Sequence, residues 1–140
     1  MTLDLSSLKN AVSSLKQALN VAHDSVFMNG LNQAQQETIR AGVIQNFEFT
    51  YELCWKFIQR WIRANVSQED ASPVTRKDLF RIAAQRGLIQ EPQKWFDYSE
   101  SRNMTSHTYD REQAESVFEA ATKFIEEAES LLKQREAHND

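Results

Sequence analysis

The sequence predicts an all-α protein, an up-and-down antiparallel helical bundle of about four or five helices. Three glycines and two prolines occur among its 140 residues, and β-rich folds usually need more turn residues than that. Apolar side chains recur at steps of three and four along three long segments, which is the period of an α-helix. No linker, repeat or low-complexity stretch divides the chain, so we expect a single domain over residues 1–140.

Two long amphipathic helices are predicted in the first half of the chain. The first covers residues 3–27, and Met28-Asn29-Gly30 ends it. Its apolar stripe consists of Leu5, Leu8, Val12, Leu15, Leu19, Ala22 and Val26. The second covers residues 34–64, where apolar residues span an arc of about 200°. A helix facing one core needs little more than about 100°, so this helix is either central in its own bundle or lines a subunit interface.

Capping residues mark the helices of the second half, after a polar connecting loop over residues 65–72. Thr75 is a plausible N-cap with Asp78 at the third helical position, and Gly87 ends the short helix that follows. Pro92 suits the first turn of a fourth helix. One face of that helix carries Trp95, Tyr98 and Arg102.

The last helix is expected to start after Asp110, which is a suitable N-cap with Gln113 three positions later. Its apolar stripe runs to about Gln134. Residues 135–140 are polar, and we predict a tail that frays from the helix.

Composition and charge exclude several functional classes. A net charge of -4 argues against a globally basic nucleic-acid binder, although a local basic site stays open. One cysteine and three scattered histidines give neither a disulfide framework nor a metal-ligand spacing, so we expect no metal and no cofactor. Neither an Asp-x-Asp pair nor a glycine-rich phosphate loop occurs, so any nucleotidyl transfer must be catalysed by another chain.

The expected location is the cytoplasm, with no membrane partner. Residues 1–5 lack the basic and apolar regions of a signal peptide. No apolar run approaches the roughly 20 residues of a membrane span. Cys54 lies in the apolar stripe of the second helix, where we expect it to pack as an unreactive thiol.

Glu48 and Glu52 lie one helical turn apart on the second helix, so they can form a carboxylate pair. Lys56 follows at the next turn, with Arg60 close by. We interpret these residues as a solvated strip with ordinary helical ion pairs. The alternative is a polar wall that faces a substrate.

The segment from Arg102 to Tyr109 gathers Arg, Asn, hydroxyl, His and Tyr side chains between two amphipathic helices. A continuous helix would leave Arg102 and His107 about 140° apart, so we expect the helix to end or kink between them. Arginine matches phosphate oxygens and histidine moves protons near neutral pH, a combination that can cleave phosphodiesters without a metal. The alternative is a helix-end cluster in which Arg102 pairs with a carboxylate and His107 caps carbonyls.

Arg102-x4-His107-x-Tyr109 resembles the R-x(4–6)-H-x-Y motif of HEPN-type proteins. The stretch Val43–Lys56 is a more specific feature, together with the order of elements that follows it: Ser72-Pro73, the Arg81–Ile89 segment, Trp95 and the motif. Over nearly the whole chain this arrangement resembles the nucleotidyltransferase substrate-binding-protein-like family, a relative of toxins of the HepT type. The resemblance implies a bundle similar to the helical domain of kanamycin nucleotidyltransferase, a homodimer, and a separately encoded minimal nucleotidyltransferase as partner.

The resemblance also implies roles for individual residues. Arg102 would bind phosphate and stabilise charge, His107 would be the general acid or base, and Asn103 would orient the ligand. Tyr109 would accept AMP from the partner, which would neutralise a metal-independent ribonuclease toxin whose site lies at the dimer interface. RNA is therefore an expected partner. One alternative is a non-catalytic subunit that presents a small acceptor to the nucleotidyltransferase, and another is a helical dimer that acts only as a scaffold.

Overall fold

The computed structural model describes residues 4–71 and 75–138, the side chains of 136–138 excepted. Its elements are α1 (Ser6–Ala22), α2 (Ser25–Asn29), α3 (Gln33–Asn65), α4 (Arg76–Gln85), α5 (Pro92–Asn103), the 3-10 helix η1 (Met104–His107) and α6 (Arg111–His138). The described residues contain helices and no strands, which confirms the predicted all-α class. Within residues 4–71 and 75–138 six α-helices form instead of four or five, because the first predicted helix is divided in two.

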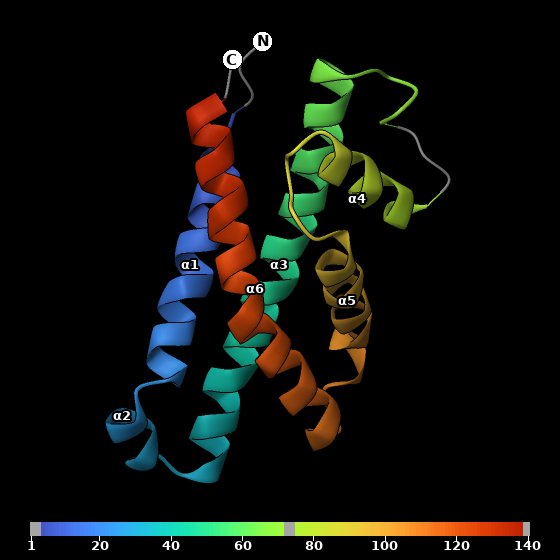
Figure 1. The fold of residues 1–140 in the computed structure, drawn as a ribbon. Coiled ribbons are helices and arrows are strands. Elements are labelled where there is room, and N and C mark those ends of the chain that lie inside the picture. Colours follow the sequence, from blue (N-terminus) through green and yellow to red (C-terminus); the bar gives the residue numbers. More distant parts are fainter. Residues whose placement is uncertain (1–3, 72–74, 139–140) are drawn as a thin grey trace.

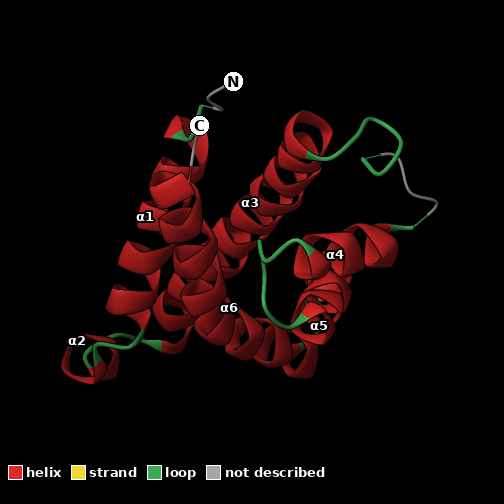
Figure 2. Ribbon diagram, turned by 45° about the horizontal axis from the view of Figure 1, so that its top comes forward, coloured by secondary structure: helices red, strands yellow, loops and turns green. Residues whose placement is uncertain are grey.

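The long helices α1, α3 and α6 pack against one another and form the centre of the bundle (Figure 1). Helices α4 and α5 contact each other and α3, and they lie across the bundle from α1 and α2 in both views (Figures 1 and 2). Since α3 touches α1, α4, α5 and α6, its wide apolar arc is explained by neighbours within its own chain.

An aromatic cluster forms the middle of the core around Phe124 of α6. The ring of Phe124 meets Phe47 edge-on at 5.3 Å, Trp95 at 5.5 Å and Tyr98 at 5.0 Å between centroids. Burying each such side chain contributes about 1.5–3 kcal/mol, and edge-to-face pairs add to this. The cluster therefore joins α3, α5 and α6.

The predicted helix over residues 3–27 is wrong in its length, and residue 3 lies outside the described residues. The chain breaks after Ala22, where Asp24 caps α2 by accepting a hydrogen bond from the Phe27 amide at 3.1 Å. Local capping by an aspartate competes with a continuous helix. Val26, which the apolar stripe included, is consequently 86% exposed, whereas the expected stop at Gly30 is confirmed as the C-cap of α2.

The other predicted helix boundaries are confirmed except one. Thr75 accepts a hydrogen bond from the Asp78 amide, Gly87 has the positive φ of 76° that favours glycine, and Pro92 opens α5. Asp110 accepts from the Glu112 amide at 2.9 Å at the start of α6. Of the residues discussed above, Ser72 and Pro73 lie outside those described.

The predicted polar tail over residues 135–140 is wrong for most of its length. Helix α6 continues to His138, and residues 139–140 lie outside the described part. Arg135 is only 4% exposed, and its guanidinium carbon lies 4.7 Å from the Trp61 ring centroid. A long arginine side chain packs its stem on apolar surface and its charge on an aromatic face, so this residue extends the packing of α6 on α3. Among the described helices, none is long and apolar enough to span a membrane.

Candidate functional site

The helix ends between Arg102 and His107, as predicted. Helix α5 stops at Asn103 and the chain tightens into η1. The hydroxyl of Thr105 donates to the Arg102 carbonyl at 2.8 Å, and that of Thr108 donates to the Thr105 carbonyl at 3.2 Å. Hydroxyl side chains that bond to nearby carbonyls compete with regular helix, so the local sequence itself produces the turn that carries the motif.

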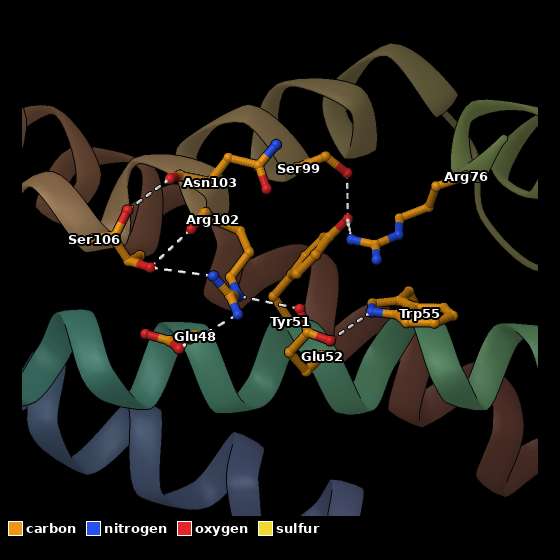
Figure 3. A network of polar contacts seen from close by, with 10 residues as sticks. Glu48, Tyr51, Glu52, Trp55, Arg76, Ser99, Arg102, Asn103 and Ser106 are labelled. Carbon is orange, nitrogen blue, oxygen red and sulfur yellow. Dashed lines mark hydrogen bonds and ion pairs between the residues drawn. The ribbon is translucent and has the colours of Figure 1, made fainter.

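Arg102 is held from α3 by two carboxylates (Figure 3). Its Nε donates to Glu52 Oε1 at 3.0 Å, and its Nη2 lies 3.4 Å from Glu48 Oε1. Its Nη1 also donates to the Thr105 hydroxyl at 3.3 Å. The part of the alternative that pairs Arg102 with a carboxylate is therefore confirmed, and Glu48 and Glu52 face this arginine rather than forming a purely solvated strip. The other part, in which His107 caps carbonyls, stays a prediction.

A second polar layer supports Glu52. Trp55 donates its indole N–H to Glu52 Oε2 at 2.8 Å, so both carboxylate oxygens of Glu52 are engaged. The guanidinium of Arg76 from α4 covers the Trp55 ring at 4.2 Å. It also donates to the Tyr51 hydroxyl at 3.3 Å, and that hydroxyl is bonded to Ser99 of α5. Helices α3, α4 and α5 are thus joined by one polar network (Figure 3).

Sequence reasoning missed the support from Trp55, Arg76 and Ser99. The available signal was weak: Trp55 lies three residues after Glu52, a spacing that lets side chains meet on a helix. The contacts of Arg76 and Ser99 with Tyr51 bridge 25 and 48 residues of sequence, a distance at which helical periodicity carries no information. Their partners are decided by how α4 and α5 pack on α3.

Burial raises the pKa of two further groups in this part of the bundle, so both stay neutral to higher pH. Burial raises the pKa of the Tyr51 phenol above its ordinary value, so the neutral hydroxyl bonds to Ser99 and Arg76. Burial also raises the pKa of the Cys54 thiol, and Cys54 is fully buried in the core. This confirms the packing position expected for Cys54, and its thiol is a poor nucleophile there.

His107 and Tyr109 lie beyond Arg102 on the surface of the same turn. His107 is exposed, and its ring centroid is 6.3 Å from that of Tyr109. The Tyr109 side chain is 88% exposed. Asn103 is also exposed and accepts a hydrogen bond from the Ser106 hydroxyl through its main-chain carbonyl. The structure therefore brings all four residues to one end of α5, with Arg102 anchored and the other three open to solvent.

This arrangement supplies a fixed cation, Arg102, and an accessible imidazole, His107. Within the described residues, no group of three or more His, Cys, Asp and Glu side chains is placed to hold a metal ion. An arginine fork can bind a phosphate bidentately, and an exposed imidazole can reach a proton on a bound substrate. The site can thus bind a phosphate and move a proton beside it.

Residues 3–137 match the family described as nucleotidyltransferase substrate binding protein like. The chain belongs to this family. A relative from Haemophilus influenzae, named probable ribonuclease HepT, is 36% identical over 138 residues, which cover 98% of this chain and 94% of the relative. The family resemblance predicted from the sequence is confirmed.

Two solved structures share the fold. One, from Haemophilus influenzae, is described as revealing the fold of a substrate binding domain of a nucleotidyltransferase. It has 36% identity and a TM-score of 0.89, and the match covers 94% of this chain and 98% of that one. A Thermus thermophilus protein, at 24% identity and a TM-score of 0.70, covers 91% of this chain and is itself covered to 97%. This second match shows the fold alone.

Proposed function

We propose that this chain is the helical subunit of a two-component system with a separately encoded minimal nucleotidyltransferase, and that it is a metal-independent ribonuclease toxin of the HEPN type. The observation that carries the proposal is the placement of an anchored Arg102 and an exposed His107 in the segment where α5 ends and η1 follows. The name of the relative, probable ribonuclease HepT, supports the same chemistry.

In the proposed reaction a ribose 2'-hydroxyl attacks the adjacent phosphorus. The bond to the 5'-oxygen of the next nucleotide breaks, and the products are a 2',3'-cyclic phosphate and a free 5'-hydroxyl. His107 takes the proton from the 2'-hydroxyl or returns one to the leaving oxygen, and Arg102 stabilises the negative charge on the phosphate. Asn103 orients the bound strand. The chain acts as a cytoplasmic homodimer in which Arg102 and His107 of both protomers line one RNA cleft.

Tyr109 is the proposed site of neutralisation. Its Oη attacks the α-phosphorus of ATP held by the partner and loses its proton to solvent. A new O–P bond forms, the bond between the α-phosphorus and the bridging oxygen breaks, and pyrophosphate leaves. The 88% exposure of Tyr109 gives another protein access to this hydroxyl. An adenylyl group at this position adds a charged phosphate close to His107, because the two rings lie 6.3 Å apart, and so it blocks RNA.

A second candidate function is a non-catalytic subunit that presents a small acceptor to the nucleotidyltransferase. The observation that favours it is the pairing of Arg102 with both Glu48 and Glu52. Two carboxylates around one guanidinium leave a net negative charge at this position. Negative charge repels RNA, and the overall charge of -4 has the same sign. The description of the Haemophilus influenzae structure also suits this function.

Cleavage of RNA in EDTA separates the two candidates. Purified protein with unmodified Tyr109 is compared with His107→Ala and with His23→Ala, an exposed histidine that contacts Thr122 elsewhere in the bundle. We expect wild type and His23→Ala to cleave, and His107→Ala to be slower by about 10²–10⁴-fold. Absence of cleavage by all three proteins, or equal cleavage by all three, would contradict the ribonuclease proposal.

A further inference from the structure

A groove lies beside Tyr109, between the first part of α3 and the start of α6. Its volume is about 500 Å³, within the roughly 300–1,000 Å³ of typical small-molecule sites. Its apolar lining comes from Ala41, Ile44 and Ala114, and Tyr109 adds an aromatic ring. Two cations, Arg40 and Arg111, line it together with two carboxylates, Glu37 and Glu115. The two arginines can hold a phosphate, and the apolar wall with the exposed ring can hold a flat aromatic base.

The two arginines of the groove are available to an anion. The guanidinium carbon of Arg40 lies 5.3 Å from the Phe118 ring centroid, a cation–π contact, and the residue is exposed to solvent. Arg111 Nη2 lies 3.1 Å from Glu37 Oε1, with the two side chains 81% and 51% exposed. Exposed ion pairs contribute little free energy, so a phosphate can replace Glu37 as the partner of Arg111.

Tyr109 adds a stacking surface at the edge of the groove. Its ring is 88% exposed, and aromatic side chains stack on nucleobases in single-stranded nucleic-acid sites. Thr108, which also lines the groove, bonds to the Thr105 carbonyl next to Arg102. The groove therefore continues directly from the turn that carries the proposed catalytic residues.

We propose that this groove is a binding site for one nucleotide unit, with the phosphate held by Arg40 and Arg111 and the base against the apolar lining and the Tyr109 ring. The proposal deepens the proposed function and rests on it for the source of the nucleotide. That source is either a nucleotide of the RNA substrate or the adenylyl group on Tyr109. If the RNA nucleotide and the adenylyl group share this groove, the modification directly blocks RNA binding, because the adenylyl group then occupies the position of an RNA nucleotide.

Titration with AMP, followed by NMR chemical shifts, tests the site itself. Arg40→Gln and Arg111→Gln each remove a cation from the groove, and Arg81→Gln is the matched control, an exposed arginine of α4 that pairs with Asp78. We expect each groove variant to raise the Kd for AMP about tenfold and the control to leave it unchanged. Glu37→Gln is expected to lower the Kd, because it releases Arg111.

An uncleavable 2'-O-methyl RNA oligonucleotide distinguishes the two sources. Weaker binding of this RNA by both groove variants identifies RNA as the source, and unchanged binding identifies the adenylyl group. Absence of AMP binding, or equal AMP binding by wild type, Arg40→Gln and Arg111→Gln, would overturn the groove proposal. If RNA is nevertheless cleaved in a His107-dependent manner, the failure concerns the groove alone. AMP binding without any cleavage would instead overturn the ribonuclease and leave the groove supported.

Discussion

Arg102 and Tyr109 lie on the same short turn, yet Arg102 bonds to two carboxylates of α3 whereas the Tyr109 ring is 88% exposed. The anchored region contains Arg102, Glu52 and the network behind them. The exposed region contains His107 and Tyr109. Orientation of a phosphate requires a cation in a fixed place, whereas access for RNA or a partner enzyme requires side chains in solvent. The Arg102 end of the turn meets the first requirement, and the end that carries His107 and Tyr109 meets the second.

Among the residues that anchor Arg102, the largest effect is expected from the carboxylates. Glu52 uses one oxygen for Arg102 and the other for Trp55, whereas Glu48 makes a longer contact of 3.4 Å and is more exposed. Glu52→Gln should lower kcat for RNA cleavage by about 10–100-fold, because a misplaced arginine loses alignment with the phosphate. Glu48→Gln, the matched control, should change kcat much less. Equal losses in kcat for the two variants would remove the distinction between them.

A smaller effect, on stability, is expected from Tyr51→Phe. The variant loses the hydroxyl that bonds to Ser99 and Arg76, so the free energy of unfolding in urea should fall by about 1–2 kcal/mol. Burial raises the pKa of Tyr51 from its ordinary 10.0. Its contribution is therefore complete below about pH 10 and is lost as the pH rises through the folded value.

The alkaline decline in stability should thus be shallower in Tyr51→Phe than in wild type. Burial also raises the pKa of Tyr98 and of Cys54, so part of the decline should persist in the variant. Urea unfolding at several pH values measures both effects. A decline as steep in the variant as in wild type would show that Tyr51 does not contribute to it.

The smallest effect on stability is expected from Tyr109→Phe in the exposed region. Because the side chain is 88% exposed, the free energy of unfolding should change by less than about 0.5 kcal/mol. Intact mass after co-expression with the partner nucleotidyltransferase should show an adenylyl group on wild type and none on the variant. An adenylyl group on Tyr109→Phe would place the acceptor elsewhere, and a large loss of stability would contradict the exposed position.

Local signals predicted much of the fold because their causes lie within one helical turn. The caps at Thr75 and Asp110 and the stop at Gly87 each involve neighbouring backbone groups. The break before Asp24 was also local, yet the continuous apolar stripe concealed it. The prediction of a frayed tail at Arg135 was wrong for a different reason, since its partner Trp61 lies on another helix.

The candidate site shows the same division. The sequence alone determined that a turn interrupts the helix between Arg102 and His107, because the Thr105 and Thr108 hydroxyls bond to carbonyls three residues away. It also determined which functional groups that turn carries. Only the tertiary structure decided that Arg102 is bound to Glu48 and Glu52 while His107 and Tyr109 face solvent. Arg102 and Glu52 are 50 residues apart in sequence. The packing of α5 on α3 around Phe124 brings their charges together.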